Sequence, residues 1–350
     1  MVYFIYYNLK LNYQRFEKGI SKHKISYFNI MVISLIVAFW AVWNFNVGFE
    51  DHETYGHQFE IQSYNPGYNQ SYGLGLVWDF LHKFTYKRNT MFRFMIFCGN
   101  FLTLSAYRRD KNIKPQAMLI LFLSEYFMYS FVAIKQFIAT GFSFLFFADF
   151  SNNKKLRSII WIPPAIMFHE MAYILIPIFF ALFFEKNKFM RNCMIFISTV
   201  LLIFPTVANR ALPYIFSFVP ELEQQLDSYM DVGKLRLQSN YFTVLKGLPF
   251  YIGCIIPIWS GNEKRLQAPN YNLGRALTIM SSLFVLASFY NYWYFRFSYL
   301  FMLPVFSYIV NITEDAKSSD VIILKKLFVL SIAGLTLKYM LQMYFKYGGI

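Results

Sequence analysis

Long apolar stretches alternate with short basic segments along most of the chain, and this pattern predicts an all-α polytopic membrane protein. A helix needs about 20 mostly apolar residues to cross a bilayer. The first two such stretches cover about 26–47 and 91–106. Over the whole chain the pattern predicts about eleven transmembrane helices, some of them short or re-entrant. The larger polar segments are 48–90, whose part 73–84 is amphipathic, and 209–240. We therefore expect residues 1–350 to form a single integral membrane domain.

The composition agrees with a membrane protein, because 57% of the residues are hydrophobic and only 15% are charged. Soluble domains carry about 25% charged residues, so an ordinary soluble enzyme is excluded. The formal net charge of +14 would suggest nucleic acid in a soluble protein. No hydrophilic domain exists to carry a basic surface of duplex size, so we expect no nucleic-acid partner.

The distribution of Lys and Arg predicts the orientation of the chain. Cytoplasmic loops of membrane proteins collect basic residues. Most of the 33 Lys and Arg fall in segments that lie inside the cell if the N-terminus is cytoplasmic. The polar segments 48–90 and 209–240 then become larger periplasmic loops. The inner loops hold runs of charge in which we recognise no catalytic constellation.

The apolar region 128–184 is interrupted by Lys135-Gln136 and by Phe168-His169-Glu170. A cation or an imidazole inside such a region is costly to keep and is by default a functional-site hypothesis. Residues 116–150 and 158–185 are each too short for two full spans of about 20 residues. We therefore expect the tips near Lys135 and His169 to lie below the outer membrane surface, in a recessed cleft.

The unusual polar residues all map to the outer side in this topology. They are Asp51, Tyr55, Lys135, Gln136, His169, Arg210 and Arg296. Lys and Arg suit a phosphate-bearing lipid, Arg through its planar fork and Lys as a point charge. His169, Glu170 or Asp51 could accept a proton from an attacking hydroxyl.

Each of these residues also has a purely structural interpretation. Lys135 would extend to the lipid headgroups, and His169 would be an interfacial histidine whose hydrogen bonds are satisfied. Arg296, beside several aromatic residues, would anchor the chain at the membrane interface through cation–π contacts. Asp51 and Tyr55 would be ordinary loop residues.

The order of five short motifs resembles the EpsG-like family of bacterial exopolysaccharide, capsule and O-antigen gene clusters, which is related to the Wzy-type polymerases. The motifs are Asp51-x-x-x-Tyr55, Pro66-Gly67-Tyr68, Lys135-Gln136-x-Ile138-Ala139, Phe168-His169 and Arg296. The family usually has Arg where this chain has Lys135 and Glu where it has Asn65. Lys135 thereby lacks the bidentate fork of an arginine.

The resemblance implies a GT-C-like architecture and a repeat-unit polymerase of O-antigen, capsule or exopolysaccharide, at the periplasmic face of the bacterial inner membrane. Its substrate would be undecaprenyl-pyrophosphate-linked oligosaccharide, and membrane lipids and a chain-length regulator protein would be its partners. Cations would bind the pyrophosphate, tyrosines would stack on sugars, and His169 or Asp51 would be the catalytic base. The substrate-binding residues would be Lys135, Gln136, Arg210, Arg296, Tyr55 and Tyr68. No Asp-x-Asp motif occurs, so we expect neither metal nor cofactor.

Two other functions are consistent with the same residues. One is a lipid-linked oligosaccharide flippase, although no internal repeat is visible and the cations gather on one side. The other is a different lipid-dependent glycosyltransferase or ligase, which would share the cleft and differ in its acceptor.

We predict that His169→Ala and Arg296→Ala each abolish the polysaccharide ladder while the protein still inserts into the membrane. The first change removes a proton acceptor and the second a cation for the leaving group. Gel analysis of surface polysaccharide, with immunoblotting of membranes, measures both effects. Full-length polymer from both variants would exclude this site assignment.

Overall fold

Every regular element in the described part of the chain is a helix. The structure is a computed structural model that describes residues 1–44, 50–60, 72–124, 126, 133–183, 196 and 297–315. The elements are α1 (Val2–Glu17), α2 (Tyr27–Asn44), α3 (Glu50–Glu60), α4 (Tyr72–His82), α5 (Arg88–Arg109), α6 (Pro115–Leu123), α8 (Ile134–Ser151), α9 (Lys155–Ile159), α10 (Ile162–Phe168), η1 (Glu170–Ile174), α11 (Leu175–Phe183), η3 (Tyr299–Phe301) and α18 (Met302–Asp315).

The chain divides into two compact units, residues 1–172 with 333–350 and residues 173–332. In the second unit the structure describes α11 and, separately, η3 packed against α18. The first unit contains α1 to α10 and most of the predicted site residues.

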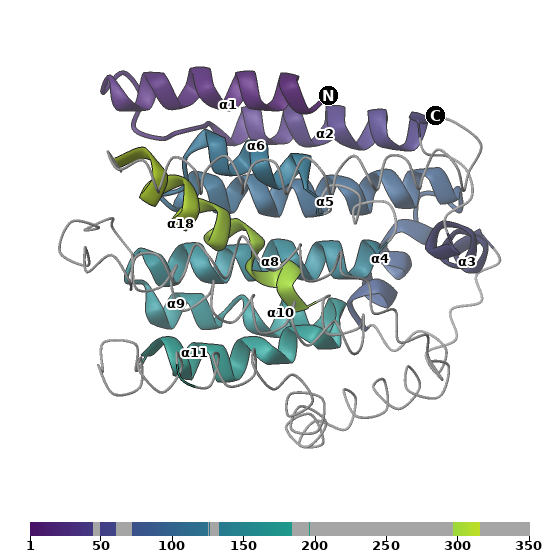
Figure 1. Cartoon of the computed structure of the whole chain (residues 1–350). Helices are drawn as coiled ribbons and strands as arrows, with labels where there is room; N and C mark the ends of the chain where they lie inside the picture. Colours follow the sequence, from purple (N-terminus) through teal and green to yellow (C-terminus); the bar gives the residue numbers. More distant parts are fainter. Residues whose placement is uncertain are drawn as a thin grey trace, which may run out of the picture. The chain divides into compact units, whose positions relative to one another are not determined.

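The first unit is organised around α5 and α8, which lie side by side (Figure 1). Two glycines allow this close approach. A Cβ on Gly141 would lie 2.8 Å from the Cβ of Leu102, and one on Gly99 would lie 2.1 Å from the ring of Phe137. Small residues at a helix interface let two backbones approach closely. Of the residues of α8, only Lys135 and Phe142 are not buried, so this helix is enclosed on nearly all sides.

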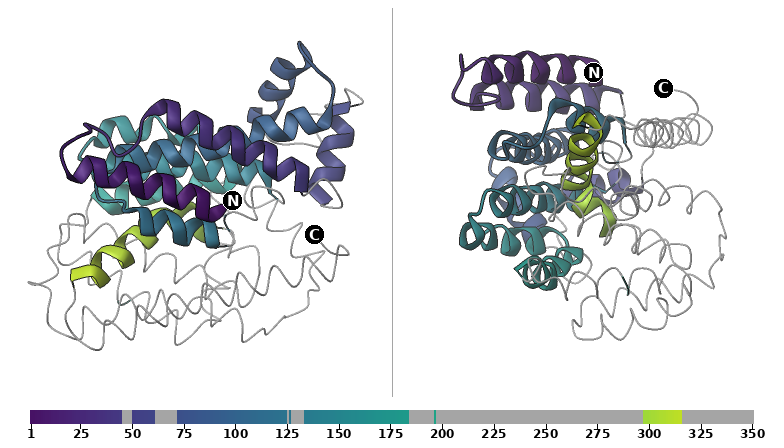
Figure 2. Two further views of the ribbon diagram at one scale, coloured as in Figure 1. Left: turned by 90° about the horizontal axis from the view of Figure 1, so that it is seen from above. Right: turned by 60° about the vertical axis from the view of Figure 1, so that its left-hand side comes forward.

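The remaining helices of the first unit attach to this pair. Helix α2 packs on the α5 side, α1 packs on α6, and α9 and α10 pack on α8. Helices α3 and α4 lie together at one end of α5 and α8 (Figures 1 and 2). Gly56 of α3 lies against Arg88 and Phe92 in the first turns of α5, which fixes the position of α3.

The region after α8 is broken into short helices. Helices α9, α10 and η1 have 5, 7 and 5 residues. Pro163 and Pro164 lie in the first turn of α10, where the missing N–H groups cost little, so they begin this helix rather than break one.

Within the part of the chain that the structure describes, no helix combines the length and apolar character that a membrane crossing needs. The number of spans, the cytoplasmic N-terminus, the GT-C-like architecture and the single membrane domain stay predictions. Residues 209–240 and the helices expected near them lie outside the described residues. The expected helices at 26–47 and 91–106 correspond to α2 and α5.

We predict that Gly141→Ala destabilises the protein, because the new methyl group would push against the Cβ of Leu102, which cannot move without its backbone. Overpacking of this kind lowers the free energy of unfolding by about 1–3 kcal/mol. Thermal unfolding of the purified protein should show a lower apparent Tm. Gly56→Ala is the matched control, since its closest neighbour is the flexible Arg88 side chain at 3.1 Å. Equal Tm values for Gly141→Ala and wild type would contradict the packing described here.

Candidate functional site

The first turn of α8 brings Lys135 against Tyr55 of α3. The Nζ atom of Lys135 lies 5.1 Å from the centroid of the Tyr55 ring, within the range of a cation–π contact. A cation in the first turn of a helix gains nothing from the helix dipole, which favours anions there. Helix stability therefore does not explain Lys135, and the tyrosine ring compensates part of the cost of its charge.

Phe142 shows which other segment lies along the Lys135 face of α8. Positions 135 and 142 are seven residues apart and share one helix face. The ring of Phe142 stacks on two rings of the following segment. Its centroid lies 6.2 Å from that of Trp161 and 6.0 Å from that of Phe168. Helix α10, whose end carries Phe168-His169, therefore packs along the face of α8 that also carries Lys135.

His169 follows the end of α10 in extended backbone, with φ −155° and ψ 124°. Its side chain is nearly buried. The backbone N–H of Met171 lies 3.2 Å from Nδ1, and Oε1 of Glu170 lies 3.3 Å from the same atom. Only one of these contacts can be a hydrogen bond at a time, because Nδ1 either accepts from the N–H or donates to the carboxylate. When Nδ1 carries the proton, the lone pair of Nε2 can accept one.

Helix α4 closes on the same tip. A Cβ on Gly73 would lie 3.0 Å from the carbonyl oxygen of Met167 and 3.0 Å from Cδ2 of Phe168. This glycine permits the first turn of α4 to touch the residues just before His169. Helices α3, α4, α8 and α10 thus bring Tyr55, Lys135 and the Phe168-His169 tip to one end of the first unit; we call this the Lys135 end.

The other predicted site residues separate into two groups. Gln136 is 1% exposed, so it is enclosed by protein and not presented beside Lys135. Asp51 lies in the first turn of α3, one helical turn before Tyr55. Tyr68, Arg210 and Arg296 lie outside the described residues.

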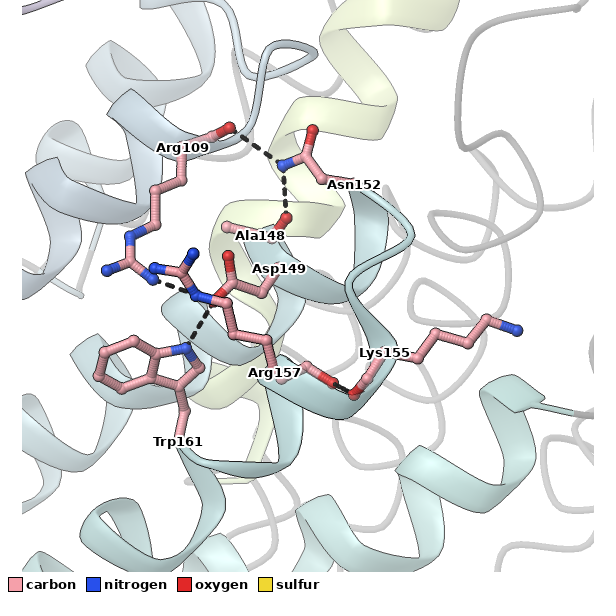
Figure 3. A network of polar contacts seen from close by, with 8 residues as sticks. Arg109, Ala148, Asp149, Asn152, Lys155, Arg157 and Trp161 are labelled. Atoms are coloured by element: carbon pink, nitrogen blue, oxygen red, sulfur yellow. Dashed lines mark hydrogen bonds and ion pairs between the residues drawn. The ribbon is translucent and has the colours of Figure 1, made fainter.

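A second polar cluster surrounds Asp149 near the opposite end of α8 (Figure 3). Its side chain is 2% exposed, and its Oδ2 accepts from Arg109 Nη1 at 2.9 Å and from Trp161 Nε1 at 2.7 Å. Arg157 Nε lies 3.2 Å from the same oxygen. The guanidinium of Arg109 also stacks over the Trp161 ring at 4.8 Å. A buried carboxylate is thus surrounded by three donors, two of them cationic.

The way α8 ends explains how α9 returns to Asp149. Asn153 has a φ of 60°, in the left-handed region that asparagine tolerates. The N–H of Asn153 donates to the carbonyl of Phe150 and the N–H of Lys154 donates to the carbonyl of Asp149. This is the hydrogen-bond pattern of a Schellman motif. The resulting reversal directs α9, with Arg157, back along the end of α8.

Lys24 joins three segments near this same end. It is 1% exposed and donates from Nζ to the carbonyls of Asp110 and Ile113, beneath the ring of Tyr107. The carboxylate of Asp110 accepts from Ser151 Oγ at 2.7 Å. Burial lowers the pKa of Lys24 to about 7, and the nearby Asp110 acts in the opposite direction.

The expectation that the inner loops hold no catalytic constellation stays a prediction, because the Asp149 cluster is a set of ion pairs and hydrogen bonds within the fold. Arg109 and Arg157 belong to predicted inner loops, and both bind Asp149. The available signal was Asp149 itself, which is the only acidic residue between Glu125 and Glu170. We call the residues around Asp149 and Lys24 the Asp149 end. Lys135 and Asp149 are fourteen positions apart on α8, which corresponds to roughly 21 Å along the helix axis.

Within the described residues, no group of three or more His, Cys, Asp or Glu could hold a metal ion. The Lys135 end instead offers the Lys135 cation and the His169 imidazole with the neighbouring Glu170 carboxylate. Such a set can bind an anionic group and accept a proton.

These helices and their two polar ends define an all-α protein with a cationic candidate site at one end of its central helix pair. The chain belongs to the EpsG family, whose family profile matches residues 26–348. EpsG-like proteins are membrane-associated and polysaccharide polymerase-like, which places the chain in polysaccharide biosynthesis. Neither the curated proteins nor the solved structures contain a match to this chain.

We predict that Asp149→Asn lowers the free energy of unfolding by about 1–3 kcal/mol, because it removes the charge that compensates two guanidinium groups. The loss is modest because the Arg157 side chain is 50% exposed and can regain water. The apparent Tm of the purified variant measures this effect. Arg157→Gln is the control and should cost less than about 1 kcal/mol, as half-exposed ion pairs do. A larger loss from the control than from Asp149→Asn would contradict the central role of the carboxylate.

Proposed function

We propose that this protein polymerises undecaprenyl-pyrophosphate-linked oligosaccharide repeat units, at the outer face of the bacterial inner membrane, into O-antigen, capsule or exopolysaccharide. The observation that carries this proposal is the grouping of Tyr55, Lys135 and Phe168-His169 at one end of the α5–α8 pair. All of them belong to motifs that resemble those of the family.

The distribution of charge supports an outer position for the Lys135 end. The opposite end carries Arg108, Arg109, Lys154, Lys155 and Arg157 around Asp149 and Asp110. Basic residues of membrane proteins concentrate on the cytoplasmic side. With the Asp149 end facing the cytoplasm of a multi-pass protein, the Lys135 end faces outward, where lipid-linked repeat units are assembled into polymer.

The reaction forms one glycosidic bond and breaks one bond to pyrophosphate. A hydroxyl oxygen on the non-reducing end of one repeat unit attacks the anomeric carbon of the growing chain. The bond from this carbon to the pyrophosphate oxygen breaks, and undecaprenyl pyrophosphate leaves with the electron pair. The hydroxyl proton passes to a base of the protein. Cations near the leaving group stabilise the negative charge that develops on it.

His169 is our candidate for the base, and Glu170 would hold the proton on Nδ1 so that Nε2 faces the hydroxyl. The 3.3 Å separation of Nδ1 and Oε1 supports this arrangement. Asp51, in the first turn of α3, is the alternative base.

Lys135 would bind the pyrophosphate as a point charge. Arg210 and Arg296, which lie outside the described residues, stay predicted as further pyrophosphate-binding residues. Tyr55 would keep Lys135 in place through its ring face and contact the substrate, and Tyr68 would stack on a sugar. Gln136, which is enclosed by protein, would act by supporting the first turn of α8. The reaction proposed here needs neither metal nor cofactor, and a chain-length regulator protein would be its partner in the membrane.

The deciding experiment is a deletion strain complemented with Lys135 variants. Deletion should leave lipid core that bears a single repeat unit and no ladder. Lys135→Met should restore little polymer because the cation is lost, whereas Lys135→Arg should restore most of it, since the charge is retained with a bidentate fork. Gel analysis of surface polysaccharide measures each result.

Other outcomes would identify other functions. A deletion strain without even the single-repeat species would indicate a flippase, and accumulation of full polymer that is not transferred would indicate a ligase. A normal ladder in the deletion strain would end the polymerase proposal. Lys135→Gln and Lys135→Met should behave alike, and immunoblots of membranes control for insertion.

A further inference from the structure

Three aromatic rings form a stack beside the Lys135 end. Phe59 comes from the last turn of α3, His82 ends α4, and Tyr86 lies in the turn between α4 and α5. The ring centroids of Phe59 and His82 are 4.3 Å apart at an interplanar angle of 24°, and those of His82 and Tyr86 are 4.9 Å apart at 27°. Two rings at such distances cannot share one face of the imidazole without overlapping. His82 therefore lies between the other two rings.

The inner end of this stack is fixed by protein. Phe59 is 0% exposed and meets Trp78, which is also fully buried, edge to face at 5.8 Å. The ring atom Nε2 of His82 lies 3.0 Å from the carbonyl oxygen of Phe59. This contact fixes the position of the imidazole relative to α3. Because its base is held in this way, the stack presents its last ring, Tyr86, in a defined plane.

The outer end of the stack is open. Tyr86 is 47% exposed although one of its faces is covered by His82. Lys83 and Lys87 on either side of it along the chain are both exposed, and Arg88 pairs with Glu60 at 3.7 Å. The residues that flank Tyr86 in the chain thus include exposed groups that can donate hydrogen bonds.

The chemistry of this surface fits a sugar ring better than a lipid chain. A pyranose has an apolar face of C–H groups, whose partial positive charge is attracted to the negative face of an aromatic ring. Its edge carries hydroxyl groups that need polar partners, and the charged residues that flank Tyr86 in the chain can supply them. An acyl chain would be a poor ligand beside these charged residues, because their polar groups would lose water without gaining hydrogen bonds in return.

We propose that the exposed face of Tyr86 is a sugar-binding site that holds the oligosaccharide substrate beside the reaction centre. This inference rests on the proposed polymerase function. Phe59 and Tyr55 are one turn apart on α3, roughly 6 Å along its axis, so the stack and the Lys135–Tyr55 pair share one support. A site at this position retains the chain between additions, and its loss shortens the polymer without abolishing the reaction.

The experiment compares Tyr86→Leu with Tyr86→Phe and Tyr86→Trp in the complemented deletion strain. Leucine keeps an apolar surface and removes the flat face, so the ladder should shift to fewer repeats. Phenylalanine and tryptophan keep the face and should leave the ladder as in wild type. Saturation-transfer NMR on the purified full-length protein, with the oligosaccharide released by mild acid from the strain's own lipid-linked repeat units, should show about three- to tenfold weaker binding to Tyr86→Leu only.

Tyr72→Leu is the matched control, because Tyr72 begins α4 and is 66% exposed but lies outside the stack. Wild-type binding and chain length in Tyr86→Leu would overturn the inference. An equal loss in Tyr72→Leu, or a loss in Tyr86→Trp, would also overturn it. Failure of the polymerase proposal itself is seen separately, as a normal ladder in the deletion strain.

Discussion

The close approach of α5 and α8 is the constraint on which the first unit depends. Gly99 and Gly141 leave room for Phe137 and Leu102, and a methyl group at either glycine would separate the two helices. When these two helices are in contact, the segments that precede and follow each of them come together at the two ends of the helix pair. The Lys135 end and the Asp149 end both arise from this one packing arrangement.

The two ends differ in how they compensate charge. At the Asp149 end, a buried carboxylate is surrounded by donors from α5, α9 and the start of α10, so its desolvation is offset by charge and hydrogen bonds. At the Lys135 end, the cation faces an aromatic ring. An aromatic ring reduces the energetic cost of partly burying a cation, but it does not neutralise the positive charge. The first arrangement stabilises the fold, whereas the second leaves a positive charge that can bind an anion.

Part of the candidate site could be predicted because a charged or polar residue within an apolar region is energetically costly and is easily recognised in the sequence. Lys135 and His169 interrupt an apolar region, and this alone marked them. That Tyr55 contacts Lys135 depends on how α3 packs on α5, and the enclosure of Gln136 depends on the neighbours of α8. Asp149 interrupts the same region, yet it was missed because its partners are distant in the sequence.

The sequence by itself determined the helical class, the positions of α2 and α5, the short helices after α8 and membership of the EpsG family. Each of these follows from local pattern, from hydropathy, proline placement or short motifs. Only the tertiary structure decided that Asp149 binds residues of the supposed inner loops and that Phe59, His82 and Tyr86 stack. Contacts between segments far apart in the chain depend on how helices pack, and one sequence does not encode that packing in any local pattern.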